Sequence, residues 1–234
     1  MATLDGFITS TKGVPLAITT SQEIRDRGST FVGVLYKVQS ELEAQNCIKY
    51  HRNVVHGSHK ASHEISAWRC LTLKKGCTGL GGPDDFEVRS GCDDDGEDNG
   101  GRRALRTMES EGTIDAVVIV SRWFGGTLLG PVRFTHIETC TRDVCRTFRN
   151  IEDVEGYIEK LKDLDQELAR LRTELNSARG LENNEESVDT SPRKIDYAQS
   201  LLNPPDLTKA RRLLEARQRA VNSVKALANK QRNE

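Results

Sequence analysis

The stretch that decides the fold is Ser121–Pro131, which reads Ser-Arg-Trp-Phe-Gly-Gly-Thr-Leu-Leu-Gly-Pro and follows the run Ile114–Val120, apolar except for Asp115. An apolar run of this length is typical of a central strand whose two faces are both buried. Pro131 suits the first turn of a helix, where its missing N–H costs no hydrogen bond. The stretch therefore predicts a buried strand, a Gly-rich loop and a helix in direct succession.

Two more strands and a capped helix are predicted upstream. Phe31–Val38 is crowded with β-branched and aromatic residues, and His63–Leu73 alternates between apolar and polar residues. Between them, Ser40 offers a helix N-cap and Glu43 completes a capping box. A short strand near Val14–Thr19 would precede these elements. The apolar stripe of the helix would consist of Leu42, Cys47 and Ile48.

Residues 74–92 are Gly-rich and acidic, and they contain too few apolar side chains to pack, which predicts a mobile loop. Asn99 or Gly100 can start a helix that ends at Gly112. The order strand, helix, strand, loop, helix, strand, helix predicts a small α/β (α+β) domain with helices packed on a sheet. We place this domain at residues 1–150, with its core at 18–148. The helix after Pro131 would pack through Phe134, Ile137, Val144 and Phe148.

The pattern changes after residue 150. Apolar residues recur there at spacings of three and four, as in a coiled-coil seam. We expect residues 151–234 to form an antiparallel helical hairpin with a flexible link at 180–192. Residues 151–190 carry a net charge of −7 and residues 191–234 a net charge of +6, which favours pairing of the two arms. A dimer built on the same seam remains the alternative. The residues predicted for this interface are Leu161, Leu168, Leu171 and Leu175.

Composition limits the function classes. The 234 residues contain 34 Lys and Arg against 35 Asp and Glu, a balance that argues mildly against a free-standing nucleic-acid binder. The six cysteines form no Cys-x-x-Cys pair, and neither a signal peptide nor 18 consecutive apolar residues are present. We therefore expect a cytoplasmic protein with reduced thiols, no membrane contact and no cofactor.

An acidic turn, Asp94-Asp95-Gly96-Glu97, precedes the helix expected at residues 99–112. A calcium-binding loop would need a Glu where Arg106 stands, so no metal is predicted. Carboxylates at this position suit the free N–H groups and the positive end of a helix. Arg122 ends a buried strand and needs a counter-charge. We expect it to pair with Asp94, Asp95 or Glu97.

Other uses of these residues stay open. The glycines and Arg133 could build an anion pocket at a helix N-terminus, although the P-loop ending is absent. His59 and His63, with nearby serines, could form a hydrolytic site, but no Gly-x-Ser-x-Gly elbow is present, and we predict no catalytic residues. The aromatic residues could stack on bases or pack in the core. The candidate pocket, structural or ligand-binding, consists of His63, Trp68, Asp94, Asp95, Gly96, Glu97, Arg122, Trp123, Phe124, Gly125, Gly126, Gly130 and Arg133.

The chain resembles the Impact family, also called UPF0029, from about Ile18 to Phe148. Five motifs carry the resemblance and occur in the family's order. They are Ser29-Thr30-Phe31, Ala61–Arg69, Asp94–Glu97, Gly100-Gly101-Arg102, and Ser121–Gly126 with the continuation Leu128–Phe134.

This resemblance implies a fold similar to the second domain of a ribosomal small-subunit protein. It also implies a non-enzymatic role in regulating translation under stress, through ribosomes or through the HEAT-repeat activator of the starvation-sensing kinase that acts on initiation factor 2. RNA and actin are further partners that the resemblance suggests. The alternative is a small-ligand, phosphate or RNA-binding protein, or an uncharacterised enzyme.

The sequence departs from the family in three ways. Glu64 stands where the family usually has Asn, and one residue fewer separates Glu97 from Gly100 than in eukaryotic members. The RWD domain of eukaryotic members has no room before Ile18, so we expect a fungal-type or other eukaryotic member without it. Activator binding is tied to that domain, and its loss would weaken this activity.

Overall fold

The computed structural model describes residues 14–178 and 195–232. Its elements form two compact units, which divide between Phe148 and Arg149. Among the described residues, no helix is both long and apolar enough to cross a membrane. The elements of the first unit are β1 (Ala17–Thr20), β2 (Ile24–Asp26), β3 (Ser29–Lys37), α1 (Glu41–Tyr50), the π-helical turn η2 (His51–Val55), β4 (His63–Leu73), the 3-10 turn η3 (Pro83–Asp85), β5 (Phe86–Asp93), α2 (Gly100–Ser110), β6 (Ala116–Trp123) and the start of α3 (Val132–Ala178).

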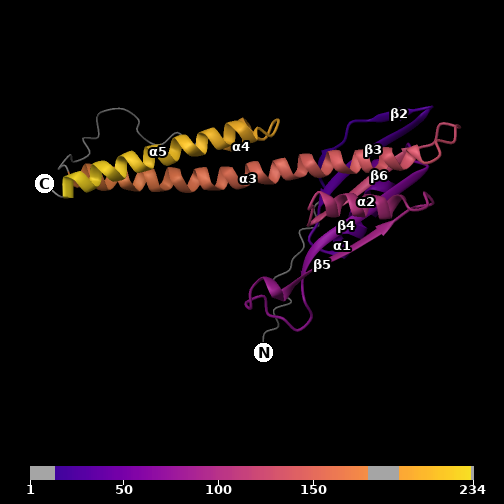
Figure 1. Cartoon of the computed structure of the whole chain (residues 1–234), viewed down its shortest axis with the longest axis horizontal. Helices are drawn as coiled ribbons and strands as arrows, with labels where there is room; N and C mark the ends of the chain where they lie inside the picture. The colour runs from indigo at the N-terminus through magenta and orange to yellow at the C-terminus, as the bar shows by residue number, and fades with distance from the viewer. Residues whose placement is uncertain (1–13, 179–194, 233–234) are drawn as a thin grey trace. The chain divides into compact units, whose positions relative to one another are not determined.

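The first unit is built on an antiparallel sheet with the strand order β1-β3-β6-β4-β5, and β2 also pairs with β3 (Figure 1). The apolar run lies in β6 at the centre of this sheet, as the sequence predicts. The strand continues through Trp123, so the first three residues of the Gly-rich stretch are strand and not loop. The fold class expected from the sequence is confirmed.

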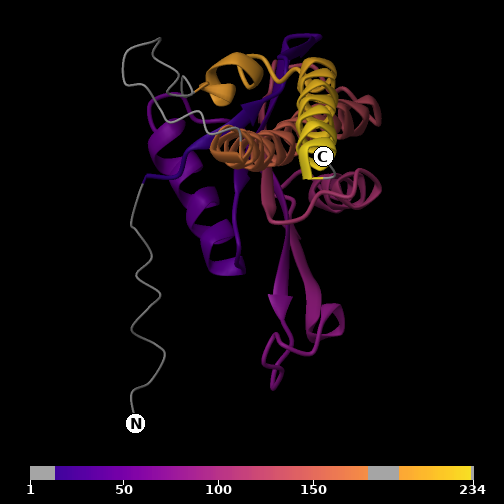
Figure 2. The ribbon, with the colours of Figure 1, turned by 90° about the vertical axis from the view of Figure 1, so that its left-hand side faces the viewer.

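Helices cover both faces of the sheet (Figure 2). On one face α1 packs through Ala44, Cys47 and Ile48 against alternate residues of β3, β4 and β6. On the other face α2 and the first turns of α3 pack against the intervening residues of the same strands. Because each strand alternates its side chains between two covered faces, the middle of β6, Ala116–Val120, is apolar on both sides.

The N-cap predicted at Ser40 is confirmed, but the Glu43 carboxylate binds the N–H of the residue before the cap and not that of Ser40 itself. The Ser40 hydroxyl accepts a hydrogen bond from the backbone N–H of Glu43 at 3.3 Å, and the Glu43 carboxylate accepts one from the N–H of Gln39 at 2.8 Å. The expected stripe is wrong at Leu42, which is 71% exposed. Ala44 is buried in its place because it lies three and four residues before Cys47 and Ile48, on the same face of the helix.

The loop predicted at residues 74–92 is only partly right. Residues 86–93 form β5, which pairs with β4 along eight residues from Leu73↔Phe86 to Ser66↔Asp93. The strand is held by backbone hydrogen bonds and needs little apolar surface of its own, so its composition concealed it. Gly91 is required in this ladder because a Cβ there would lie 2.8 Å from the Trp68 ring.

In the second unit, α3 is followed by α4 (Tyr197–Leu201) and α5 (Leu207–Arg232). The seam leucines are buried against these helices within the same chain: Leu161 packs with Leu201 and Ala210, and Leu168 and Leu171 pack with Val221. Leu175 is buried as well. The link predicted at 180–192 lies outside the described residues.

The antiparallel direction expected for these helices is wrong. Positions further along α3 meet positions further along α5, so the two helices run in the same direction (Figure 1). The expected charge pairing holds: Asp165 meets Arg217 at 2.8 Å, and Glu167 meets Lys225 at 2.6 Å.

Candidate functional site

Asp94, the first residue of the acidic turn, accepts hydrogen bonds from backbone N–H groups at the start of α2. One Asp94 carboxylate oxygen accepts from the N–H of Asn99 at 3.0 Å, and the other accepts from the N–H of Gly101 at 2.8 Å. These N–H groups have no partner inside the helix, and the carboxylate also meets the positive end of the helix dipole. Asp94 therefore acts as a cap, in agreement with the structural interpretation of the sequence.

Asp95 joins the turn to β4 and to η2. One oxygen of its carboxylate accepts from the backbone N–H of Glu64 at 2.7 Å, and the other lies 2.9 Å from the Arg52 guanidinium. Its backbone carbonyl lies 2.9 Å from Nδ1 of His63. Gly96 follows with φ +81°, a conformation that glycine adopts without steric cost. The turn is thus fixed by contacts of Asp95 with Glu64, Arg52 and His63.

Glu97 is the counter-charge of Arg122, which confirms the expected pairing. Both side chains are buried, at 4% and 5% exposure. Arg133, from the first turn of α3, forms a second ion pair with the same carboxylate. Nε2 of His63 lies 3.9 Å from it. One carboxylate therefore ties together the acidic turn, β6 and α3.

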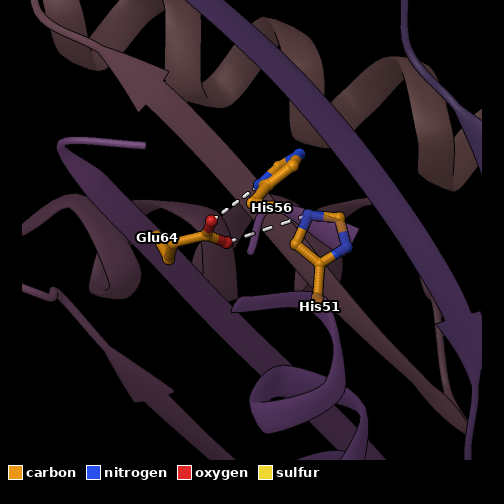
Figure 3. Close-up of side chains that lie close together, drawn as sticks. All are labelled: His51, His56 and Glu64. Atoms are coloured by element: carbon orange, nitrogen blue, oxygen red, sulfur yellow. Dashed lines mark hydrogen bonds and ion pairs between the residues drawn. The ribbon is translucent and has the colours of Figure 1, made fainter. Parts of the chain in front are cut away.

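A second polar cluster contains Glu64, His51 and His56 (Figure 3). In the β4–β6 ladder, His63 pairs with Arg122 and Glu64 pairs with Ser121. Because neighbouring residues of a strand point to opposite faces, Glu64 and Ser121 point away from the Glu97 cluster. They meet His51 and His56, which stand at the start and just after the end of η2.

This second cluster is closely connected. Nδ1 of His56 lies 2.7 Å from one oxygen of the Glu64 carboxylate, and Nε2 of His51 lies 3.8 Å from the other. The Ser121 hydroxyl donates to Glu64 at 3.3 Å. The second nitrogen of His51, Nδ1, lies 2.8 Å from the Tyr36 hydroxyl. Burial lowers the pKa of His51 to about 4, with a smaller contribution from His56, so its imidazole is neutral at neutral pH.

The aromatic residues divide between core and surface. Trp68 is buried beside α1, which agrees with a packing role. Trp123 contacts the rings of His56 and His59, at centroid distances of 5.0 and 5.6 Å. Phe124 is 45% exposed. Of the predicted aromatic positions, only Trp123 and Phe124 lie where another molecule can reach them.

The glycines of the candidate pocket permit backbone conformations and a close backbone contact that other residues would not allow. A Cβ on Gly125 would lie 1.9 Å from the carbonyl carbon of Gly28, so this close approach of two loops requires glycine. Gly126 and Gly130 have φ values of +85° and +61°, and a Cβ on either would meet nothing within 4 Å. A cavity of about 390 Å³ lies between the β1–β2 segment and α3, and it is lined by Ser21, Gln22, Glu23, Ile24, Thr139, Cys140, Arg142, Asp143 and Arg146. Its lining contains none of the predicted pocket residues.

The charged groups of the candidate pocket thus contact one another. Arg122 and Arg133 bind Glu97, Asp94 binds α2, and Asp95 binds β4. This arrangement can hold four segments in fixed positions. The sequence-based prediction identified these residues but missed His51 and His56. Their spacing of five residues matches no helical face, so the sequence pattern gave no signal for them.

Comparison with known proteins identifies the family. The model of the Impact N-terminal domain matches residues 27–145. The chain is 36% identical to human Protein IMPACT over 122 residues, which are 52% of this chain and 34% of that protein. It is 35% identical to the Saccharomyces cerevisiae Protein IMPACT homolog over 128 residues, or 53% of this chain and 44% of that protein. A solved structure of the two-domain translational regulator Yih1 is 34% identical to this chain, with a TM-score of 0.34. The match covers 55% of this chain and 46% of the chain in that structure.

The matches cover about a third to just under half of each curated relative. In this chain the matched region holds β3 to β6, the acidic turn and the Arg122–Glu97 pair. Since the family model matches just over half of the chain, the chain belongs to the Impact family.

Proposed function

We propose that this protein is a non-enzymatic regulator or adaptor of translation, which acts in the cytoplasm by docking on ribosomes or on a ribosome-bound partner. The observation that carries the proposal is the Impact N-terminal domain at residues 27–145. A solved relative with the same kind of domain is described as a two-domain translational regulator. The role is assigned here to the shared domain and not to the longer relatives as a whole.

The geometry of the candidate site supports a binding role. The charged groups of the motifs form ion pairs with one another or hydrogen bonds with the backbone, so they stabilise the fold. A hydrolytic use of His63 has less support, because this imidazole contacts the Asp95 carbonyl and the Glu97 carboxylate. An anion pocket at Arg122 and Arg133 has less support for the same reason.

The surface offers a basic contact for a ribosome. A small cavity of about 190 Å³ at the start of α2 is lined by Asn99, Arg102, Arg103, Arg106 and Phe134. Arg102, Arg103 and Arg106 are all exposed, and Arg103 also forms an ion pair with Glu138 at 2.7 Å. Exposed arginines beside an aromatic ring suit the phosphates and bases of ribosomal RNA.

Sedimentation of cell extract on a sucrose gradient, after gentle crosslinking, tests the proposal. We expect the protein to co-sediment with ribosomal particles and the double variant Arg102→Glu/Arg106→Glu to shift toward the top. A matched control, Lys49→Glu/Lys75→Glu, reverses two exposed charges elsewhere and should sediment like the wild type. A wild-type protein that stays wholly in the top fractions contradicts ribosome docking.

The partner can be resolved further in the same extracts. Ribonuclease treatment separates contact with RNA from contact with protein, and affinity purification shows whether the HEAT-repeat activator of the starvation-sensing kinase, or actin, is retained. If the activator is retained, phosphorylation of initiation factor 2 should fall when this protein is overproduced. Unchanged phosphorylation despite a retained activator would separate binding from regulation of that pathway.

A further inference from the structure

We propose that His51, His56 and Glu64 form a binding site for a divalent transition metal of the Zn²⁺ class. The donor atoms of these three side chains all lie within 4.8 Å of one another. His51 and Glu64 are buried, and His56 is partly exposed at the edge of the cluster (Figure 3). This site is separate from the Glu97 cluster and does not rest on the proposed role in translation.

The distances are close to those that a metal ion requires. Donors bound tetrahedrally at about 2.0–2.1 Å from zinc lie roughly 3.4 Å from one another. In the cluster, Nδ1 of His56 lies 2.7 Å from one Glu64 oxygen, and Nε2 of His51 lies 3.8 Å from the other. These two distances go to different oxygens of the carboxylate, and with one donor atom taken from each residue all three donors lie within 4.8 Å of one another. Rotations of the side chains must therefore draw the donors closer to bring them around one ion.

The donor set selects the class of metal. Two imidazoles and one carboxylate suit Zn²⁺ and similar transition metals, whereas Mg²⁺ and Ca²⁺ prefer oxygen ligands only. Three protein ligands leave a fourth position for water or for another donor. Because His56 is the exposed member, the ion can reach the site from its side of the cluster.

Groups around the cluster orient the donors. Nδ1 of His51 lies 2.8 Å from the Tyr36 hydroxyl, which fixes the ring. Nε2 then lies 3.3 Å from the Ser121 hydroxyl and 3.8 Å from Glu64. Second contacts of this kind set the tautomer and orientation of a metal-binding histidine. The rings of His51 and Trp123 flank His56 at centroid distances of 4.4 and 5.0 Å.

The backbone brings the two histidines together by an unusual turn. In an α-helix, residues five apart point about 140° away from each other. Here the chain adopts the π-helical turn η2, and the N–H of His56 donates to the carbonyl of His51 at 3.0 Å. This i→i+5 hydrogen bond stacks the two residues one turn apart. Short π-helical turns occur frequently at functional sites.

Metal binding replaces a proton. The hydrogen bond between Nδ1 of His56 and Glu64 holds one proton between two donor atoms. When the ion binds, it takes the position between these atoms, and His56 binds it as the neutral tautomer that carries its proton on Nε2. No oxidant or reductant is involved.

Titration of the full chain with ZnCl2 tests the site. The chain is freed of metal with EDTA and carries Cys77→Ser and Cys92→Ser, because these are the more accessible of the described cysteines. We expect calorimetry to show one Zn²⁺ per chain, with a melting temperature that rises on zinc addition and falls back with EDTA. MgCl2 should give neither effect. No zinc uptake at micromolar free Zn²⁺ would overturn the proposal.

Variants locate the bound ion. Glu64→Gln and His56→Ala should each weaken zinc binding at least tenfold. His59→Ala removes a neighbouring exposed histidine and should bind zinc within twofold of the parent chain. Far-UV circular dichroism identifies any variant that fails to fold, and the other variant then decides. Unchanged affinity in a folded Glu64→Gln or His56→Ala variant would refute the site.

Co²⁺ gives a spectroscopic readout of the ligands. We expect bound Co²⁺ to show the visible absorption of a low-coordinate site without a thiolate charge-transfer band, and Zn²⁺ to displace it. A thiolate band would mean that a cysteine holds the metal, which would contradict the assignment. An unchanged Co²⁺ spectrum in the folded Glu64→Gln variant would contradict it as well.

Discussion

Arg122 and Glu97 form a buried ion pair that joins the end of β6 to the acidic turn before α2. The Glu97 carboxylate also binds Arg133 of α3, so two cations share one anion. The rings of Phe31 and Phe124 lie 5.4 and 5.7 Å from the Arg122 guanidinium carbon. The pair is therefore a junction between a strand, a turn and a helix.

Loss of this junction should destabilise the first unit. Removing one partner of a buried pair costs about 3–5 kcal/mol, and Arg122→Ala leaves Glu97 buried with only Arg133 as its counter-charge. Urea unfolding at neutral pH measures the free energy of unfolding. Arg133→Ala is the control and should cost less, because the Arg133 side chain is 29% exposed. A soluble Arg122→Ala protein with an unchanged melting temperature would contradict this account.

The cap at the start of α2 should make a smaller contribution. Asp94→Ala leaves the N–H groups of Asn99 and Gly101 without their acceptor and should cost about 1 kcal/mol. Asp94→Asn keeps one acceptor oxygen but loses the charge and one of the two hydrogen bonds, so it should lie between the wild type and Asp94→Ala. Equal stability of all three proteins in urea would show that the cap contributes nothing.

Two glycines should respond in opposite ways to replacement by alanine. Gly125→Ala places a Cβ against the backbone of Gly28 and should prevent normal packing of the two loops. Gly156 lies inside α3, where a Cβ meets nothing within 4 Å, so Gly156→Ala should stabilise the helix by about 0.5–1 kcal/mol. Thermal unfolding followed by circular dichroism measures both effects. A neutral Gly125→Ala variant would show that the loops separate easily.

Cysteine reactivity should follow burial. Burial raises the pKa of Cys70 and of Cys140 to about 11, so less than about one part in a hundred of each thiol is ionised at pH 8. Brief treatment with iodoacetamide at pH 8 should modify the exposed Cys92 and spare these two. Raising the pH increases the thiolate fraction but not access. Peptide mass spectrometry reads the extent of modification, and equal labelling of Cys70 and Cys92 in folded protein would contradict the packing.

The C-terminal helices should not need a second chain. The seam leucines of α3 are covered by α4 and α5 of the same chain, and Asp165 and Glu167 have their cations on α5. Light scattering of the full chain at micromolar concentration should therefore give a mass near 26.1 kDa. A mass of twice that value would indicate that the seam exchanges partners between two copies.

Local patterns predicted much of the first unit. The apolar run of β6, the alternation of β4 and the N-cap at Ser40 depend on neighbours in the chain, so each could be identified without tertiary contacts. The pairing of Arg122 with the acidic turn followed from the cost of a buried charge. That argument limited the partner to three carboxylates but did not choose among them.

The features that were missed depend on distant partners. Strand β5 exists because β4 supplies its hydrogen bonds, and its own residues carry little strand preference. The direction of α5 depends on which α3 positions it packs against, and a seam of leucines and alanines accepts either direction.

The sequence by itself determined the family, the central strand, the capped helix and the charges that must be neutralised, because periodicity and burial cost act locally. Only the tertiary structure decided that Glu97 is the carboxylate bound to Arg122, and that Glu64 turns to the opposite face to meet His51 and His56. A spacing of five would separate those histidines on an α-helix. The π-helical turn, supported by the sheet packed against it, brings them together, and no rule based on sequence spacing could anticipate that change of helical period.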